Sequence, residues 1–427
     1  MTIRPQRGAA SLAVVMLLLF ATALGVLHLN RGLLFDQRIS ANQMRATQAL
    51  ESAEAGIEWA TGMLNSPYNI DTDCELSDTA TTTFRKRYVM TQWDATPSSS
   101  AAIPADNVFP GCRLTADGPA CDCPDVPAAG QPDAVASLGT DIEPSFTVSF
   151  AAVAGDPEAV QITSRGCVAS ENVCSPDDAA ATDGNAVVTT TIKIRPLLRA
   201  APAAPLTCGK SCTIGGSYNL INANVETNGV LVNAGEGITT GPGTDLSTLP
   251  GVPSQNALVG NDASLANLSS NDPTCENSAM FNAYFGSTIE KYRAAPSTKQ
   301  LSCTSASDCK NKITDAYGDG WRSFYFDTDV HLSGNGTLGS SADPVTLVTA
   351  SGLDINGTWD IYGLVFSNSA EINDLGTGSA SIHGAQIACA GYRNNGNGTT
   401  EYDADALKNA RRFTGTMVRV PGSWRDF

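Results

Sequence analysis

Uncharged residues fill the chain from Ala9 to Leu29, and only Ser11, Thr22, Gly25 and His28 interrupt its apolar positions. A helix rises about 1.5 Å per residue, so a run of this length covers the roughly 30 Å of a bilayer's hydrocarbon core. The pattern predicts a transmembrane helix over residues 9–29.

A different helical pattern follows over residues 30–66. Its apolar positions recur at alternating steps of three and four, while Glu51, Glu54 and Glu58 occupy the opposite side. Pro67 is expected to end the helix, because proline cannot continue one. The helix is therefore predicted to continue as an amphipathic segment whose apolar stripe forms an assembly interface: Leu50, Ala53, Ile57, Ala60 and Leu64.

Residues 67–199 contain strand-like runs rich in β-branched and aromatic residues, separated by turn-rich segments. We expect them to form a β-rich domain whose sheet packs on the outer half of the helix and buries its Leu and Ile stripe. The residues from Thr96 to Gln131 read as loops on that sheet. The predicted strands are Arg85–Gln92, Ser145–Val153, Ala159–Ser164 and Ala186–Ile194.

A second β domain is expected after a short Ala/Pro linker at residues 200–206. In residues 207–427, short apolar segments recur between Gly and Asn residues, as in the coils of a β-solenoid, although a β-sandwich fits the same pattern. Residues 256–322 read as a helical or mixed insertion. The predicted fold class is α+β.

Charge narrows the functional classes. The chain has 26 Lys and Arg against 43 Asp and Glu, a formal net charge of -17. A nucleic-acid partner is therefore not expected, because phosphate binding requires a basic surface.

The basic residues Arg4 and Arg7 precede the apolar run, which predicts that residues 1–8 stay in the cytoplasm and the rest lies outside. All 12 cysteines lie beyond the run, in what would be an oxidising compartment, so disulfides are expected. Cysteines close enough to close small loops are Cys167 with Cys174, Cys208 with Cys212, and Cys303 with Cys309.

Cys121 and Cys123 lie too close to pair easily with each other, and each is expected to join a distant partner such as Cys74, Cys112, Cys275 or Cys389. Zinc binding by Cys112, Cys121 and Cys123 is the alternative. Their spacing is poor for a structural zinc site and no histidine is near.

The basic leader with the sequence RGAAS, the uncharged run and the segment QMRATQALESAEAGIEW at residues 43–59 together resemble the N-terminal region of PilX-type minor pilins of type IV pili. The resemblance implies cleavage by a prepilin peptidase after Gly8, N-methylation of Ala9, and incorporation into a pilus through the helix. It also implies a pilin-like sheet on the helix.

Two positions depart from the usual pilin pattern. Ala9 replaces the customary Phe or Met, which leaves methylation open. Ala13 stands where major pilins carry a Glu whose carboxylate neutralises a neighbour's amino terminus inside the apolar helix bundle. A subunit without this carboxylate suits the top of the filament, where no subunit lies above it.

No recognisable catalytic motif is present in the sequence. His331 and His383 are candidate bases but stand alone in strand-like sequence. The segment TDAYGDGW, with Asp315 and Asp319, is a calcium-loop candidate that lacks the EF-hand spacing. No other cofactor is expected, and the chain is not expected to be an enzyme.

These observations predict a minor pilin at the tip of a type IV pilus that primes assembly and presents its β domain for adhesion. Expected partners are other minor pilins, the major pilin, a large tip adhesin, the prepilin peptidase and, before assembly, the inner membrane. The alternatives are a tip pseudopilin of type II secretion, a membrane-anchored solenoid enzyme acting on polysaccharide, and an anchored carbohydrate-binding adhesin.

Overall fold

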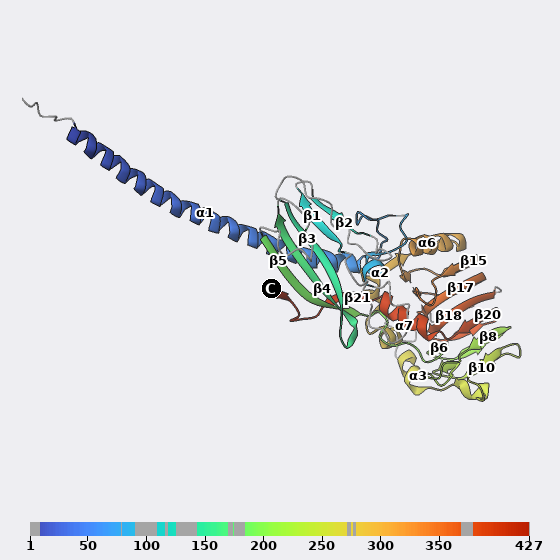
Figure 1. Cartoon of the computed structure of the whole chain (residues 1–427). Helices are drawn as coiled ribbons and strands as arrows, with labels where there is room; N and C mark the ends of the chain where they lie inside the picture. Colours follow the sequence, from blue (N-terminus) through green and yellow to red (C-terminus); the bar gives the residue numbers. More distant parts are fainter. Residues whose placement is uncertain are drawn as a thin grey trace, which may run out of the picture.

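The computed structural model describes residues 9–77, 79–89, 109–115, 118–124, 143–169, 174, 184–270, 275, 279–368 and 379–426. These residues form a long helix, an antiparallel sheet and a parallel β-solenoid, which follow one another along the molecule (Figure 1). The α+β fold class is confirmed.

Helix α1 (Ala9–Asn65) is a single helix of 57 residues, about 86 Å long at the usual rise. It ends two residues before Pro67, as predicted. Its first half extends away from the rest of the molecule, and its second half lies against the antiparallel sheet (Figure 1).

The antiparallel sheet has the order β2-β1-β3-β4-β5-β21, and β22 also pairs with β5. Three of the predicted strands, at residues 145–153, 159–164 and 186–194, lie within β3, β4 and β5 and are confirmed. The strands are β1 (Gly111–Thr115), β2 (Gly118–Asp122), β3 (Glu143–Val153), β4 (Asp156–Ala169), β5 (Gly184–Arg195), β21 (Thr416–Arg419) and β22 (Arg425–Asp426).

The end of the chain belongs to this first sheet, which corrects the predicted boundary of the second domain at residue 427. Thr416 pairs with Arg195 and Arg425 pairs with Thr189, so β21 and β22 lie along the same edge of β5. The pilin-like part is therefore built from residues 67–199 together with the last residues of the chain.

The sheet meets α1 through a close approach of the two backbones. At Gly166 of β4, a Cβ atom would lie 1.9 Å from the carbonyl oxygen of Ala49 and 2.5 Å from the amide nitrogen of Ala53. Only glycine leaves room for the helix there. The core between helix and sheet includes Ile57, Leu64, Val148, Ile162, Val188 and Ile192.

The prediction of a strand at Arg85–Gln92 was wrong where the structure can test it, because residues 84–88 form helix α2 (Phe84–Tyr88). The Thr83 side chain accepts a hydrogen bond from the Lys86 amide and caps the helix. Phe84 and Tyr88, four residues apart, pack side by side with ring centroids 4.7 Å apart. Residues 90–92 lie outside the described part.

The second domain is a β-solenoid, since all its strand pairs are parallel. This decides between the solenoid and the sandwich. Its strands are β6 (Leu206–Cys208), β7 (Cys212–Ile214), β8 (Tyr218–Ile221), β9 (Val232–Ala234), β10 (Ile238–Thr240), β11 (Asp245–Ser247), β12 (Leu258–Val259), β13 (Thr298–Leu301), β14 (Ser323–Phe326), β15 (Val330–Leu338), β16 (Val345–Thr349), β17 (Leu353–Ser367), β18 (Ser379–Ala388), β19 (Tyr392–Asn394) and β20 (Asn397–Glu401).

The coils of the solenoid do not follow chain order. The first coil, β6–β8, lies between the second coil, β9–β11, and the last coil, β18–β20. The chain therefore enters the solenoid at an inner coil and continues through β9–β12 to one end. It then crosses to β13 at the other end and runs back through the later strands until β18 and β20 pair with the first coil. Burial of Phe324, Phe326, Trp359 and Ile361 forms the interior of this domain.

The crossing segment is the predicted insertion at residues 256–322. Helices α4 and α5 cover one outer face of the solenoid, where Phe281, Phe285 and Tyr292 pack on Phe366 and Leu364. Helix α7 also packs on β17 and β18. The helices of this domain are η1 (Ser254–Ala257), α3 (Ala263–Ser270), α4 (Ala279–Phe285), α5 (Ile289–Arg293), α6 (Ala306–Gly318) and α7 (Ala404–Phe413).

The linker at residues 200–206 is docked rather than a free spacer, which corrects the expectation from its Ala/Pro composition. The Arg199 and Ala200 amides both donate to the Tyr284 carbonyl, and Ala204 and Leu206 are fully buried. The linker is therefore packed against the solenoid domain.

Candidate assembly helix and its anchoring junction

Residues 11–26, in the first half of α1, carry exposed apolar side chains on every side of the helix. Leu17 is 69% exposed and Phe20 is 65% exposed. A contiguous apolar surface of this size indicates a site that lipid or other protein chains cover. It includes Leu12, Val14, Val15, Met16, Leu17, Leu18, Leu19, Phe20, Leu24 and Val26.

The predicted processing and assembly positions fall at the start of this helix. Ala9 is the first residue of α1, whereas Gly8 lies outside the described residues. Ala13 is exposed among the apolar side chains. Among the residues that the structure describes, no helix combines the length and apolar character that a membrane crossing requires.

The second half of α1 corrects the predicted assembly interface. Ala53, Ile57, Ala60 and Leu64 are at most 1% exposed, and Leu50 packs half-buried against the same core. The chain's own sheet therefore covers the stripe, and it is not available to another subunit. The expectation that the sheet buries this stripe is confirmed.

The opposite side of this half keeps Glu51, Glu54 and Glu58 exposed. Together with Arg419 and Trp424 they line a groove of about 410 Å³ beside the returning chain end. Arg419 forms an ion pair with Glu58 at 2.8 Å. Trp424 is 46% exposed.

The carboxyl end of α1 is clamped to the returning strand by Asn65. Its amide nitrogen donates to the Met417 carbonyl at 3.0 Å, and its oxygen accepts from the Met417 amide at 2.7 Å. These bonds occupy the outer edge of β21 and imitate a further strand. The helix that leads out of the molecule is thus joined directly to the sheet edge.

Arg85 reinforces this clamp from the buried side. Its guanidinium donates to the Leu64 and Gly415 carbonyls, both at 2.7 Å, and to Asn65 Oδ1 at 3.3 Å. Burial lowers the pKa of Arg85 to about 10, and the group stays protonated at neutral pH. The end of α1 and the start of β21 are therefore held by one buried cation.

A second contact joins α2 to the solenoid through Asp343. Arg322 donates to both carboxylate oxygens of Asp343 at 2.8 Å, and Lys86 donates to Oδ2 at 3.0 Å. Burial alone would raise the pKa of Asp343, but the hydrogen bonds from Arg322 and the charges of Arg322 and Lys86 outweigh it and lower the pKa. The carboxylate is thus fixed between the two domains.

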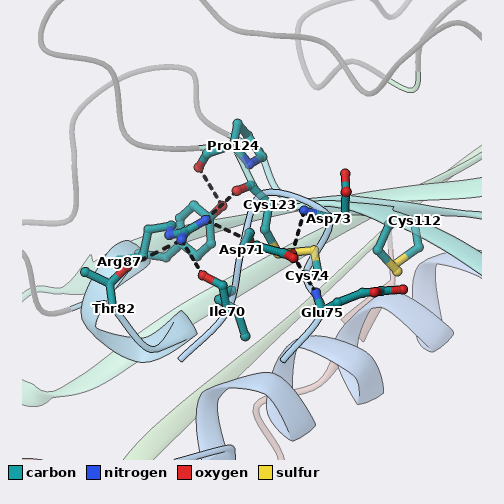
Figure 2. The surroundings of a disulfide bond; sticks show 12 residues. Ile70, Asp71, Asp73, Cys74, Glu75, Thr82, Arg87, Cys112, Cys123 and Pro124 are labelled. Carbon is teal, nitrogen blue, oxygen red and sulfur yellow. Dashed lines mark hydrogen bonds between the residues drawn. A yellow bond between two sulfur atoms is a disulfide. The ribbon is translucent and has the colours of Figure 1, made fainter. Parts of the chain in front are cut away.

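The loop before α2 is tied down by the disulfide between Cys74 and Cys123 (Figure 2). Arg87 sits beside it and donates to the carbonyls of Ile70, Asp71 and Cys123, at 2.7, 3.1 and 2.6 Å. One guanidinium therefore organises the carbonyls of two segments that the disulfide joins.

All cysteines are paired in the structure, which confirms the three predicted short loops. Cys121 and Cys123 each have a distant partner, as expected, so neither is a thiolate ligand for zinc. The pairs are Cys74–Cys123, Cys112–Cys121, Cys167–Cys174, Cys208–Cys212, Cys275–Cys389 and Cys303–Cys309.

The two candidate catalytic histidines lie on the exposed face of the solenoid but not together. His331 contacts Asp354 at 3.2 Å, whereas His383 stacks on Tyr362 with ring centroids 4.4 Å apart. Asp354 and Tyr362 are eight positions apart on β17, a distance of about 26 Å. The structure therefore does not combine the histidines in one site.

The predicted calcium loop at Asp315 and Asp319 is instead the end of helix α6, where Asp319 is the C-cap. The Asp319 carbonyl accepts a hydrogen bond from the Asn69 amide, so this backbone oxygen joins the solenoid domain to the first domain. In the described part of the chain, no cluster of three or more His, Cys, Asp or Glu side chains suits a metal ion.

A long N-terminal helix, half buried on an antiparallel sheet and half exposed with apolar side chains, defines a type IV pilin-like protein. Residues 7–58 match the family described as PilX N-terminal, which covers the segment that carried the resemblance. The N-terminal region is thus that of a PilX-like type IV minor pilin.

Comparison with curated proteins found no match. Among solved structures, the chain is similar to the competence-associated pilin ComZ from Thermus thermophilus, with 13% identity, a TM-score of 0.22 and coverage of 90% of this chain and 97% of that one. It is also similar to an ice binding protein from an Antarctic Biological Consortium, with 16% identity, a TM-score of 0.23 and coverage of 51% and 95%. Neither score establishes a common fold.

Proposed function

We propose that this protein is a minor pilin at the tip of a type IV pilus, where it primes assembly and presents its solenoid outward. The exposed apolar half of α1 is the observation that carries the proposal. Such a surface is stable only when covered, either by lipid before assembly or by the helices of other subunits afterwards. The role we propose is structural rather than enzymatic.

Ala13 supports a place at the top of the filament. Its methyl group adds no carboxylate to the exposed apolar helix, so it offers no charge to neutralise the amino terminus of a subunit above. The end of the filament is the position where this contact is not needed. The partners below would be other minor pilins and the major pilin, and a large tip adhesin would be held above.

The path to the filament would begin in the inner membrane, with residues 9–29 in the bilayer and the two β domains in the periplasm. A prepilin peptidase would cut between Gly8 and Ala9. The formal charge of -17 supports a protein partner over nucleic acid.

The exposed face of the solenoid is suited to presentation. Outward positions of neighbouring strands align in a polar row across the coils, with strands about 4.8 Å apart. A flat surface of hydroxyl, amide and carboxylate groups offers many hydrogen bonds to an adhesion target. One row consists of Thr337, Asp360, Ser381, Thr399 and Asn219.

The test is expression with and without a prepilin peptidase, followed by N-terminal sequencing and immunoblotting of sheared pili. We expect a start at Ala9 only with the peptidase, and the processed chain in the sheared fraction at a few copies per filament. Gly8→Leu should block processing and leave the chain in the membrane fraction. A processed chain that never appears in sheared pili would contradict incorporation.

A further inference from the structure

A cleft of about 450 Å³ lies where the end of the antiparallel sheet meets helices α4 and α5. Three cationic side chains line it: Arg195 ends β5, Arg199 directly precedes the docked linker, and Lys291 belongs to α5. Among the residues that the structure describes, no acidic residue lines the cleft. This is unusual in a chain whose formal net charge is -17.

The fold fixes the backbone from which two of the three exposed cationic side chains extend. The Arg199 amide donates to the Tyr284 carbonyl, and its side-chain stem lies over Gly286, whose φ of +65° requires the left-handed conformation. Arg195 is fixed by its pairing with Thr416. Within the described residues, none of the three cations forms an ion pair, so their charges remain available and repel one another.

The remainder of the cleft adds apolar surface and one unused hydroxyl. Leu197 and Val418 line it, and Val418 is 39% exposed, whereas Phe285 in the same lining is only 3% exposed. The buried hydroxyl of Ser287, also in the lining, makes no hydrogen bond within the described part of the chain. A small inorganic anion would contact the cations but leave the apolar surface exposed to water. A peptide with alternating acidic and apolar side chains would contact the cations and bury the apolar surface as well.

We propose that this cleft binds an extended acidic segment of another protein chain, with carboxylates on Arg195, Arg199 and Lys291 and apolar side chains against Leu197 and Val418. That the partner is a neighbouring pilus subunit rests on the proposed function. Binding itself depends only on the cleft.

The test uses the purified full chain in detergent and a fluorescein-labelled octapeptide in which Val alternates with Glu, followed by fluorescence anisotropy. The comparison peptide replaces each Glu with Gln. The test variant is Arg195→Gln/Arg199→Gln/Lys291→Gln. The matched control is Lys408→Gln, which removes one exposed cation from α7.

We expect the Glu peptide to bind, with the Gln peptide and the triple variant each weaker by about ten-fold, because three partly solvated ion pairs are lost together. Lys408→Gln should bind the peptide as the unmodified chain does. An unchanged thermal midpoint for the triple variant will show that it is folded, and single variants replace it if the midpoint falls.

Equal binding of both peptides, or equal binding by the triple variant, would overturn the proposal. Displacement by inorganic phosphate as effective as that by unlabelled peptide would also overturn it and indicate a site for small anions only. If the chain is found in sheared pili but does not bind the peptide, the proposed binding by the cleft is contradicted and the proposed function is not. Peptide binding by a chain that is absent from pili would remove the proposed function alone.

Discussion

The two halves of helix α1 have the same backbone and opposite environments. Leu17 in the first half is 69% exposed, whereas Ile57 in the second is 1% exposed. The difference lies in what surrounds them: the first half is apolar on all sides and leaves the molecule, while the second is apolar on one side and carries small residues that allow the sheet to approach.

The second half of α1 therefore contributes to the stability of the folded domain, whereas the first half is left for contacts outside it. Packing of the second half against β3, β4 and β5 stabilises the folded domain. The first half contributes little to that stability because it contacts nothing in the described part of the chain. Its free energy of burial is gained only with lipid or other subunits.

The largest expected effect comes from truncating one apolar side chain to Ala in each half of α1 and comparing the results. Ile57→Ala should lower the free energy of unfolding by about 3 kcal/mol, because it leaves a cavity in a closed core. Leu17→Ala should leave the unfolding of the same domain unchanged. Urea denaturation of the full chain in detergent, followed by near-ultraviolet circular dichroism, measures both.

The amount of chain found in sheared pili should depend on the first half of α1 and not on the second. Leu17→Asp places a charge in a helix bundle or bilayer and should remove the chain from sheared pili without changing its unfolding midpoint. Ile57→Val, which removes one methylene group, should remain in pili. If Leu17→Asp is incorporated normally, the exposed half is not an assembly surface.

The sequence predicts the helix and the sheet that buries its stripe, but it does not show whether that burial leaves the stripe free for another subunit. A step of three and four residues identifies an apolar stripe at Ile57 and Leu64, and Pro67 marks the end. The pattern is the same whether the covering surface belongs to the same chain or to a neighbour. The pattern therefore fits both an assembly interface and a contact with the chain's own sheet, and the structure shows that the sheet covers the stripe completely.

Long-range pairing was equally hidden in the sequence. Strand β21 returns to β5, and β6 pairs with β18, at separations that no local pattern records. Local signals at Asp315 and Asp319 were also misread, because the glycines beside them suggested a loop. The cap at Ser305, whose hydroxyl accepts from the Asp308 amide, was the signal for helix α6.

A second experiment sharpens the contrast at the contact between helix and sheet. Gly166→Ala should cost about 2 kcal/mol of the free energy of unfolding, because its methyl group would overlap the backbone of Ala49 and Ala53. The matched control is Gly62→Ala in the same half of α1, where a methyl group meets nothing within 4 Å. The control should be neutral or stabilise by up to about 1 kcal/mol, owing to the helix propensity of Ala. Equal effects would mean that the helix does not lie on β4.

The smallest expected effect concerns the point where the anchored half ends and the solenoid begins. Asp343→Asn should lower the free energy of unfolding by about 1 kcal/mol at pH 7, because Arg322 and Lys86 lose a shared carboxylate. The pKa of Asp343 is lowered in the folded state, so its stabilisation is complete above the unfolded pKa of about 3.9 and is lost as pH falls through the folded pKa. The difference between the unmodified chain and the variant should therefore be constant from pH 7 to pH 5 and shrink below about pH 4.

Asp245→Asn, at an exposed position on β11, serves as the control and should show no such difference. A difference that persists unchanged at pH 2 would show that the carboxylate charge does not hold the two domains together.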